Sequence, residues 1–110
     1  MKTLLKSALS ITLLTGFLQA ECIGTYCTKV TVERLYVVAN GDILIETSGN
    51  ELNLNCTSGG NGYFTIPNEH TSKNIFYSML LTAKTTKEKL FLAPIAASPI
   101  CELSYMYTNG

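Results

Sequence analysis

Four cysteines in a short chain constrain this fold more than any other feature. They are Cys22, Cys27, Cys56 and Cys101, in a sequence of 110 residues. A small domain buries too little surface to be very stable without help, so an even number of cysteines in an exported chain indicates disulfides. We therefore expect two disulfides, provided that the protein reaches an oxidising compartment.

The N-terminus indicates export. Lys2 and Lys6 precede a short apolar run over residues 8–18, and the small residue Ala20 follows. This pattern is typical of a secretory signal peptide, whereas a membrane-spanning helix needs roughly 20 mostly apolar residues. We expect a signal peptide over residues 1–20, a single disulfide-stabilised β-rich domain over residues 21–110, a periplasmic or secreted location and no permanent membrane anchor.

The four cysteines allow three pairings, of which we favour Cys22–Cys27 with Cys56–Cys101. The first would close a short loop in which Gly24 eases the bend. The second would tie the middle of the chain to its last strand and contribute about 4 kcal/mol on the loop-entropy model. A zinc site made of four thiolates would need paired CxxC spacings, which are absent, so we expect no metal and no cofactor.

The first half of the domain is predicted to be β-structure. Residues 28–39 and 42–47 are rich in β-formers and flank Asn40-Gly41, a pattern typical of a hairpin with a two-residue turn that pairs Val38 with Ile43. Alternation slips near Glu33, which predicts a bulge. Residues 52–56 alternate between apolar and polar positions and predict a half-buried strand with Cys56 facing inward.

The second half combines one helix with further strands. A helix is predicted over residues 69–84, capped by Asn68, Thr71 or Ser72. Its apolar stripe comprises Ile75, Phe76, Met79, Leu80 and Ala83. Short strands are predicted over residues 63–66, 87–93 and 100–108, and in the last of these Leu103, Tyr105 and Tyr107 share one side of the alternation.

The resulting order, β-β-β-α-β-β, predicts a mainly β fold with one α-helix. It is the order of the OB-fold, a small five-stranded Greek-key barrel, and a long bulged first strand suits that fold. The alternative is an open antiparallel sheet with one packed helix. Both remain open on the sequence alone.

Charge narrows the classes of partner. Cleavage would remove two of the eight basic residues and none of the eight acidic ones, which leaves a net charge of −2. Such a domain has no general electrostatic attraction for nucleic acid or anionic membranes. Lys84, Lys87 and Lys89 cluster at the helix end and in the next strand, and they could meet a phosphate or a sugar acid, although lysines there also suit the helix dipole and a solvated sheet edge.

No catalytic constellation stands out, so we expect no enzyme. His70 is the only histidine, and we expect a solvated residue near the helix start. Glu46 and Glu51 flank a turn in polar surroundings and do not form an evident acid–base pair. The glycine-rich residues 58–62 lack the lysine of a phosphate-binding loop and are expected to form a mobile hairpin.

Tyrosines are the most suggestive side chains, because the chain has six of them and no tryptophan. A tyrosine offers an apolar ring and a hydroxyl, which suits contacts with glycans or proteins. Tyr26, inside the small cysteine loop, and Tyr63, beside the glycine-rich segment, are the predicted ligand-binding residues.

Several segments carry a family resemblance. They include Ile43-Leu44-Ile45, Cys56, Tyr63-Phe64-Thr65-Ile66, the helix core Tyr77-Ser78-Met79-Leu80-Leu81-Thr82-Ala83-Lys84, and Cys101-Glu102-Leu103-Ser104-Tyr105. With these the chain resembles small exported proteobacterial proteins of uncharacterised function and, more distantly, the B subunits of AB5-type toxins. The resemblance to the B subunits implies an exported, disulfide-stapled OB-fold, glycan binding and assembly into homo-oligomers, and it places no sugar-contacting residue.

These features together predict an exported binding or interaction module for an envelope or extracellular glycan or protein, with no role in binding nucleic acid. The alternative is a periplasmic inhibitor or envelope stress protein that acts on a secreted hydrolase.

Overall fold

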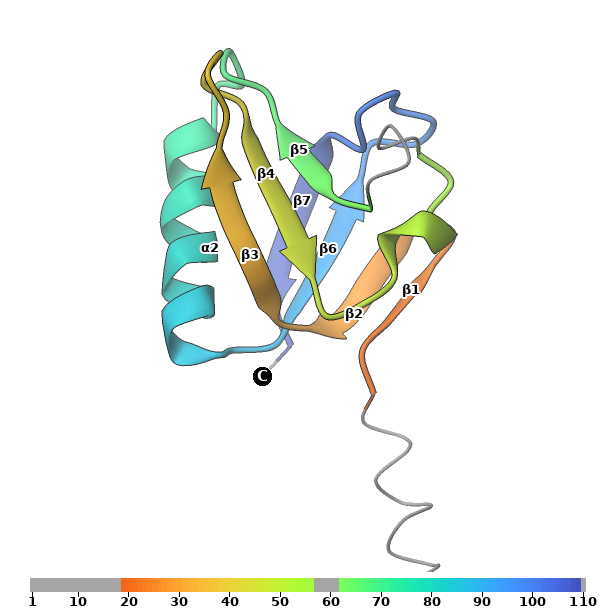
Figure 1. Ribbon diagram of the computed structural model, residues 1–110. Coiled ribbons are helices and arrows are strands. Elements are labelled where there is room, and N and C mark those ends of the chain that lie inside the picture. The colour runs from red at the N-terminus through yellow and green to blue at the C-terminus, as the bar shows by residue number, and fades with distance from the viewer. Residues whose placement is uncertain (1–18, 57–61, 110) are drawn as a thin grey trace, which may run out of the picture.

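The computed structural model describes residues 19–56 and 62–109, which form a mainly β structure with one α-helix (Figure 1). The strands are β1 (Glu21–Ile23), β2 (Tyr26–Val30), β3 (Val32–Val37), β4 (Ile43–Thr47), β5 (Phe64–Ile66), β6 (Leu90–Pro94) and β7 (Leu103–Thr108). The helices are the 3-10 helix η2 (Glu51–Asn53) and the α-helix α2 (Lys73–Thr86). Most of the expected signal peptide and of the glycine-rich segment lies outside the described residues.

The strands form two antiparallel sheets, with the orders β1-β2-β6-β7 and β3-β4-β5. The chain passes from one sheet to the other at Thr31, so the long first strand of the prediction is shared between the sheets. On the opposite side, one parallel bridge joins Thr65 to Glu102, and the Thr65 N–H donates to the Cys101 carbonyl at 3.1 Å. Within the described residues the sheets do not close into a barrel. The arrangement is compatible with the open-sheet alternative.

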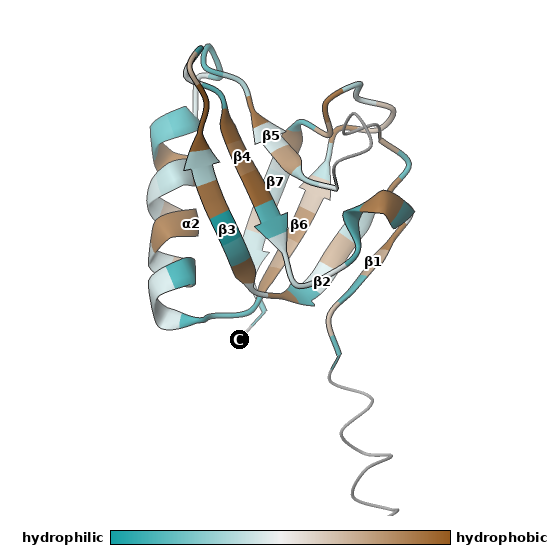
Figure 2. Ribbon diagram, in the orientation of Figure 1, coloured by the Kyte–Doolittle hydropathy of each residue, from teal (hydrophilic) through white to brown (hydrophobic). Residues whose placement is uncertain are grey.

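The core lies between the two sheets and α2, which runs beside β3 in Figure 1. Its side chains come from both sheets and the helix because each strand presents alternate residues inward. The largest side chains that are less than 2% exposed are Phe64, Ile43, Ile45, Ile66, Leu80, Leu90, Leu92, Leu103 and Val30. Figure 2 shows the hydropathy of the residues in β4, which are hydrophobic at the start of the strand and hydrophilic at its end.

The hairpin between β3 and β4 forms where Asn40-Gly41 predicted it, but the predicted register is wrong by one residue. Val37, rather than Val38, pairs with Ile43. Val38 accepts a hydrogen bond from the Gly41 N–H at 2.9 Å and donates its own N–H to the Asp42 carbonyl at 3.0 Å, which makes a three-residue loop. Gly41 has φ +93°, and a glycine in this region is what such a loop requires.

Three bulges shape the sheets. The bulge predicted near Glu33 is confirmed, because the pairing of β3 with β4 shifts between Val32 and Arg34. Pairing also shifts between Cys27 and Val30 of β2, where Lys29 has φ 55°. In β7, Ala93 pairs with Tyr105 and Pro94 pairs with Leu103, so Ser104 is an extra residue.

The prediction of a strand over residues 52–56 is wrong. Glu51–Asn53 form η2 instead, and the Asn50 side chain caps it by accepting from the Leu52 N–H at 3.2 Å. Asparagine side chains that bond nearby backbone offer the chain an alternative to a sheet ladder. Leu54 alone keeps a β-like contact, an isolated bridge to Gly24.

Helix α2 begins at Lys73, four residues after the predicted start, and ends at Thr86. Ser72 occupies the N-cap position without a side-chain capping bond. The inward stripe is narrower than predicted, because Leu80 and Ala83 are buried whereas Ile75 and Met79 are 66% and 38% exposed. Phe76 is partly buried against the core.

Two disulfides, Cys22–Cys27 and Cys56–Cys101, are present, which is the pairing favoured from the sequence. Cys22 and Cys27 face each other across β1 and β2. Cys56–Cys101 spans 45 residues and links the segment after η2 to the segment before β7. Two disulfides are consistent with a secreted or periplasmic protein.

Candidate functional site

Four aromatic side chains form a stacked row on one sheet, and we call this group the aromatic face: Tyr26, Phe91, Tyr105 and Tyr107. Phe91 stands at its centre, with ring centroids 5.1 Å from Tyr26, 4.5 Å from Tyr107 and 5.9 Å from Tyr105. The interplanar angles are 19°, 6° and 23°, so the rings are close to parallel. Offset stacked pairs at such distances stabilise each other beyond their burial.

Strand pairing positions these rings. Phe91 lies opposite Tyr107, and Ala93 lies opposite Tyr105, in the ladder between β6 and β7. Tyr26 belongs to β2, the other neighbour of β6. Neighbouring strands lie about 4.8 Å apart, which is close to the separation at which parallel rings stack. The same side of the sheet continues to Ile23, which pairs with Tyr26 and is 50% exposed.

The bulge at Ser104 decides which way the tyrosines point. Leu103 is fully buried, and regular alternation would place Tyr105 and Tyr107 beside it in the core. One extra residue reverses the alternation. Tyr105 and Tyr107 therefore face solvent, with 52% and 48% of their surface exposed.

The aromatic face is available for contact. Because β7 is the last strand of its sheet, no further strand of that sheet covers the rings of Tyr105 and Tyr107 on the side away from Phe91. Within the described chain, the hydroxyls of Tyr26, Tyr105 and Tyr107 have no hydrogen-bond partner. The face thus combines apolar rings with free donors and acceptors.

The two predicted ligand-binding tyrosines lie in different places. Tyr26 belongs to the aromatic face. Tyr63 is half-buried and directly precedes β5, a strand of the other sheet, and its ring does not stack on any ring of the aromatic face. Phe91, Tyr105 and Tyr107 were missed by sequence reasoning. One signal was available: in a regular strand the apolar Leu103 and the two tyrosines at positions 105 and 107 would share one side, although tyrosine hydroxyls favour contact with water.

His70 lies near a carboxylate. Its Nε2 is 3.9 Å from Glu102 Oε2, its Nδ1 accepts the Ser72 N–H at 3.0 Å, and its ring meets Phe76 edge-on at 5.2 Å. The histidine is half-buried rather than solvated as predicted. It connects the segment before α2 with the segment before β7.

Glu51 is buried, although the sequence placed it in polar surroundings. It is 5% exposed, and its Oε1 accepts the Thr47 N–H at 2.6 Å and the Thr47 hydroxyl at 2.7 Å. Burial raises the pKa of Glu51 above its ordinary value, while the Thr47 bonds oppose the shift. Glu46 instead pairs with Arg34 at 3.3 Å near the surface. The two glutamates have separate structural partners.

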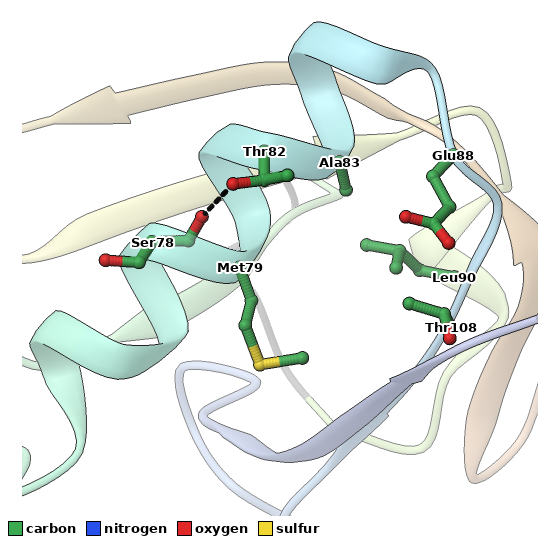
Figure 3. A pocket seen from close by; sticks show the side chains of 7 residues that line it. All are labelled: Ser78, Met79, Thr82, Ala83, Glu88, Leu90 and Thr108. Atoms are coloured by element: carbon green, nitrogen blue, oxygen red, sulfur yellow. Dashed lines mark hydrogen bonds between the residues drawn. The ribbon is translucent and has the colours of Figure 1, made fainter.

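A cavity of about 250 Å³ lies between α2 and the ladder of β6 and β7 (Figure 3). It is lined by Ser78, Met79, Thr82, Ala83, Glu88, Leu90 and Thr108. The Thr82 hydroxyl is already bonded to the Ser78 carbonyl at 2.9 Å, and Glu88 is the only titratable residue in the lining. This lining holds no acid–base pair.

Among residues 19–56 and 62–109, no group of three or more His, Cys, Asp or Glu side chains could hold a metal ion. In the same part of the chain no helix has the length and apolar character needed to cross a membrane.

Comparisons with known proteins found no matching family model, no similar curated protein and no similar solved structure.

Proposed function

We propose that this protein is an exported binding module that recognises a saccharide through its aromatic face. The observation that carries this proposal is the row of near-parallel rings on one sheet, two of them about half exposed. Soluble proteins seldom leave grouped aromatic side chains in water without a partner for them.

The chemistry of the aromatic face suits sugars. A pyranose ring has apolar C–H faces that pack on an aromatic ring, and it has hydroxyls at its rim. Tyr105 and Tyr107 offer ring surface at the sheet edge, and each carries a free hydroxyl within reach of that rim. Tyr26 and Ile23 extend the surface toward β1.

Two further observations support the proposed setting. Both disulfides favour a protein that works outside the reducing cytoplasm. The crossing at Thr31 and the parallel bridge between Thr65 and Glu102 support our proposal that the domain is related to the OB-like fold, although its two sheets do not close into a barrel within the described residues. The proposal assigns no catalysis to the chain.

A glycan array tests the proposal, with protein secreted to the periplasm so that its disulfides form. We expect a defined group of saccharides to bind, and Tyr105→Ala or Tyr107→Ala to weaken that binding about tenfold, since each change removes ring surface and a hydroxyl. Tyr36→Ala is the matched control, because Tyr36 lies in β3 on the other sheet.

Two results would overturn the saccharide assignment. One is a wild-type protein that binds no saccharide on the array. The other is unchanged binding in the Tyr105/Tyr107 double variant. Capture of a secreted hydrolase through the same tyrosines would instead favour the inhibitor alternative.

A further inference from the structure

We propose that a second, basic site near the aromatic face binds the carboxylate or phosphate of an acidic saccharide. The site is a cavity of about 340 Å³ lined by Thr31, Val32, Glu33, Lys84 and Lys87, which we call the basic cavity. This inference rests on the proposed saccharide function and names the class of saccharide.

The cavity lies where two parts of the fold meet. Thr31 and Glu33 come from the crossing between β2 and β3, and Lys84 and Lys87 come from the end of α2. Figure 1 shows this crossing, the helix end and the start of β6 at one end of the molecule. The cavity is therefore held between the start of β3 and the end of the helix.

Two more lysines lie at this end of the molecule. Asn109 ties them together, because its Oδ1 accepts the Lys29 N–H at 2.8 Å and its N–H donates to the Lys89 carbonyl at 2.8 Å. Lys89 lies two residues before Phe91 and directly precedes β6, which begins at Leu90. Along the chain, Lys89 therefore lies between Lys87 of the basic cavity and Phe91 of the aromatic face.

The lining of the cavity carries two lysines and one carboxylate, so its positive charge is only partly compensated. Neither Lys84 nor Lys87 has an ion-pair partner among the described residues. Glu33 is the one acidic residue of the lining, and its Oε1 accepts the Thr31 hydroxyl at 2.9 Å. Two ammonium groups and one carboxylate suit an anionic group that carries hydroxyls, since lysine binds the anion and glutamate accepts from a hydroxyl.

The helix dipole favours a cation at both positions, and Lys87 has a further unusual feature in its backbone conformation. Lys84 lies in the last turn, where a cation is favourable. Lys87 is the C-cap, with φ 59° and ψ 33°, and its backbone N–H donates to the Ala83 carbonyl. Glycine or asparagine suits that conformation better than lysine does. Capping therefore does not explain the side chain, whereas an anion in the basic cavity does.

A titration of the isotope-labelled protein with sodium phosphate and with sodium glucuronate, against chloride at constant ionic strength, tests the cavity alone. We expect amide shifts at Thr31, Val32, Lys84 and Lys87, and about tenfold weaker binding in Lys84→Gln and Lys87→Gly. Lys87→Gly suits its backbone position, so a loss of binding cannot be ascribed to unfolding. Lys73→Gln is the matched control at the other end of α2, where Lys73 Nζ bonds Asn68 Oδ1 at 2.7 Å.

An array that carries neutral, carboxylated and phosphorylated forms of the same saccharides tests the link to the aromatic face. We expect the acidic forms to bind about tenfold more tightly, and Lys87→Gly to remove that preference while neutral binding persists. The carboxylated and phosphorylated arms distinguish the two anions.

Several outcomes would overturn the inference. Equal binding of the neutral and acidic forms would contradict the proposed anion site but would not contradict the proposed saccharide binding. Absent shifts in the titration, or shifts that are unchanged in the lysine variants, would do the same. Stronger binding of a single-stranded oligonucleotide than of any saccharide would overturn both proposals.

Discussion

Glu51 is a carboxylate that the fold takes out of water at the turn between β4 and η2. Thr47 satisfies one of its oxygens with two hydrogen bonds. Burial nevertheless dominates and raises its pKa above the ordinary value of 4.5. The folded protein therefore retains this proton at pH values where the unfolded chain has already released it.

The sign of the pH dependence follows from this proton. Above pH 4.5 the folded state binds more protons at Glu51 than the unfolded state does, so its contribution to the free energy of unfolding falls as pH rises. We expect the free energy of unfolding of the wild type, relative to Glu51→Gln, to decrease as the pH rises above 4.5. Denaturant titrations at several pH values measure this difference. Glu21→Gln, at an exposed site, is the control, and a difference that does not change with pH would contradict the prediction.

Predictions about single residues were confirmed where a short stretch of sequence was enough to determine the local structure. The cysteine pairing and the bulge near Glu33 could be read from the sequence. The burial of Glu51 could not be predicted, because a polar turn sequence precedes it and its burial comes from the hydrogen bonds that it makes to Thr47 across that turn. Tyr26 was singled out as a binding residue, but its ring partner Phe91 comes from a strand more than sixty residues later.

At the scale of elements, α2 shows how few of its apolar residues support the core. The predicted stripe had five members, and the structure buries Leu80 completely while Ile75 remains 66% exposed. A helix that contacts its sheets along one narrow line can bury only residues three or four apart. The predicted stripe holds two such lines, one through Ile75 and Met79 and one through Phe76, Leu80 and Ala83. The sequence alone does not show which of the two lines faces the core.

We expect Leu80→Ala to destabilise the protein by about 2–5 kcal/mol, because it opens a cavity in a filled core. Ile75→Ala should change stability by at most about 0.5 kcal/mol, because the side chain is largely in water. Thermal and denaturant unfolding of both variants measure the contrast. Similar losses in the two variants would mean that the face of α2 turned toward the core has been misassigned.

The bulge at Ser104, unlike the one near Glu33, could not be predicted from the sequence. Apolar alternation in residues 100–108 suggested that two tyrosines share the buried side with Leu103. The extra residue Ser104 reverses that relation, and serine carries no local mark of a bulge. The alternation pattern therefore did not predict that Tyr105 and Tyr107 share an exposed face with Tyr26 and Phe91.

At the scale of the whole molecule, the two disulfides cross-link different parts of the fold. Cys22–Cys27 closes five residues within one hairpin, and Cys56–Cys101 closes 45 residues and ties η2 to the approach of β7. A longer closed loop removes more conformational entropy from the unfolded chain. The longer cross-link also secures the side of the molecule where the sheets are joined by one bridge.

We expect the Cys56→Ser/Cys101→Ser double variant to lose about 4 kcal/mol, against about 2 kcal/mol for Cys22→Ser/Cys27→Ser. Replacing both partners avoids free thiols that would exchange. Chemical unfolding of the oxidised wild type and both variants gives the values. Equal losses would show that loop length does not govern the stabilisation in this fold.

The stacked row of rings also makes the aromatic face an optical reporter. The chain has no tryptophan, so no indole absorbs the energy of its excited tyrosines or masks their emission. Three of the six tyrosines belong to the row, and Phe91 lies between two of them. Occupation of that surface by any molecule should change tyrosine emission and near-ultraviolet circular dichroism of the unlabelled protein, which makes ligand discovery possible without a tag.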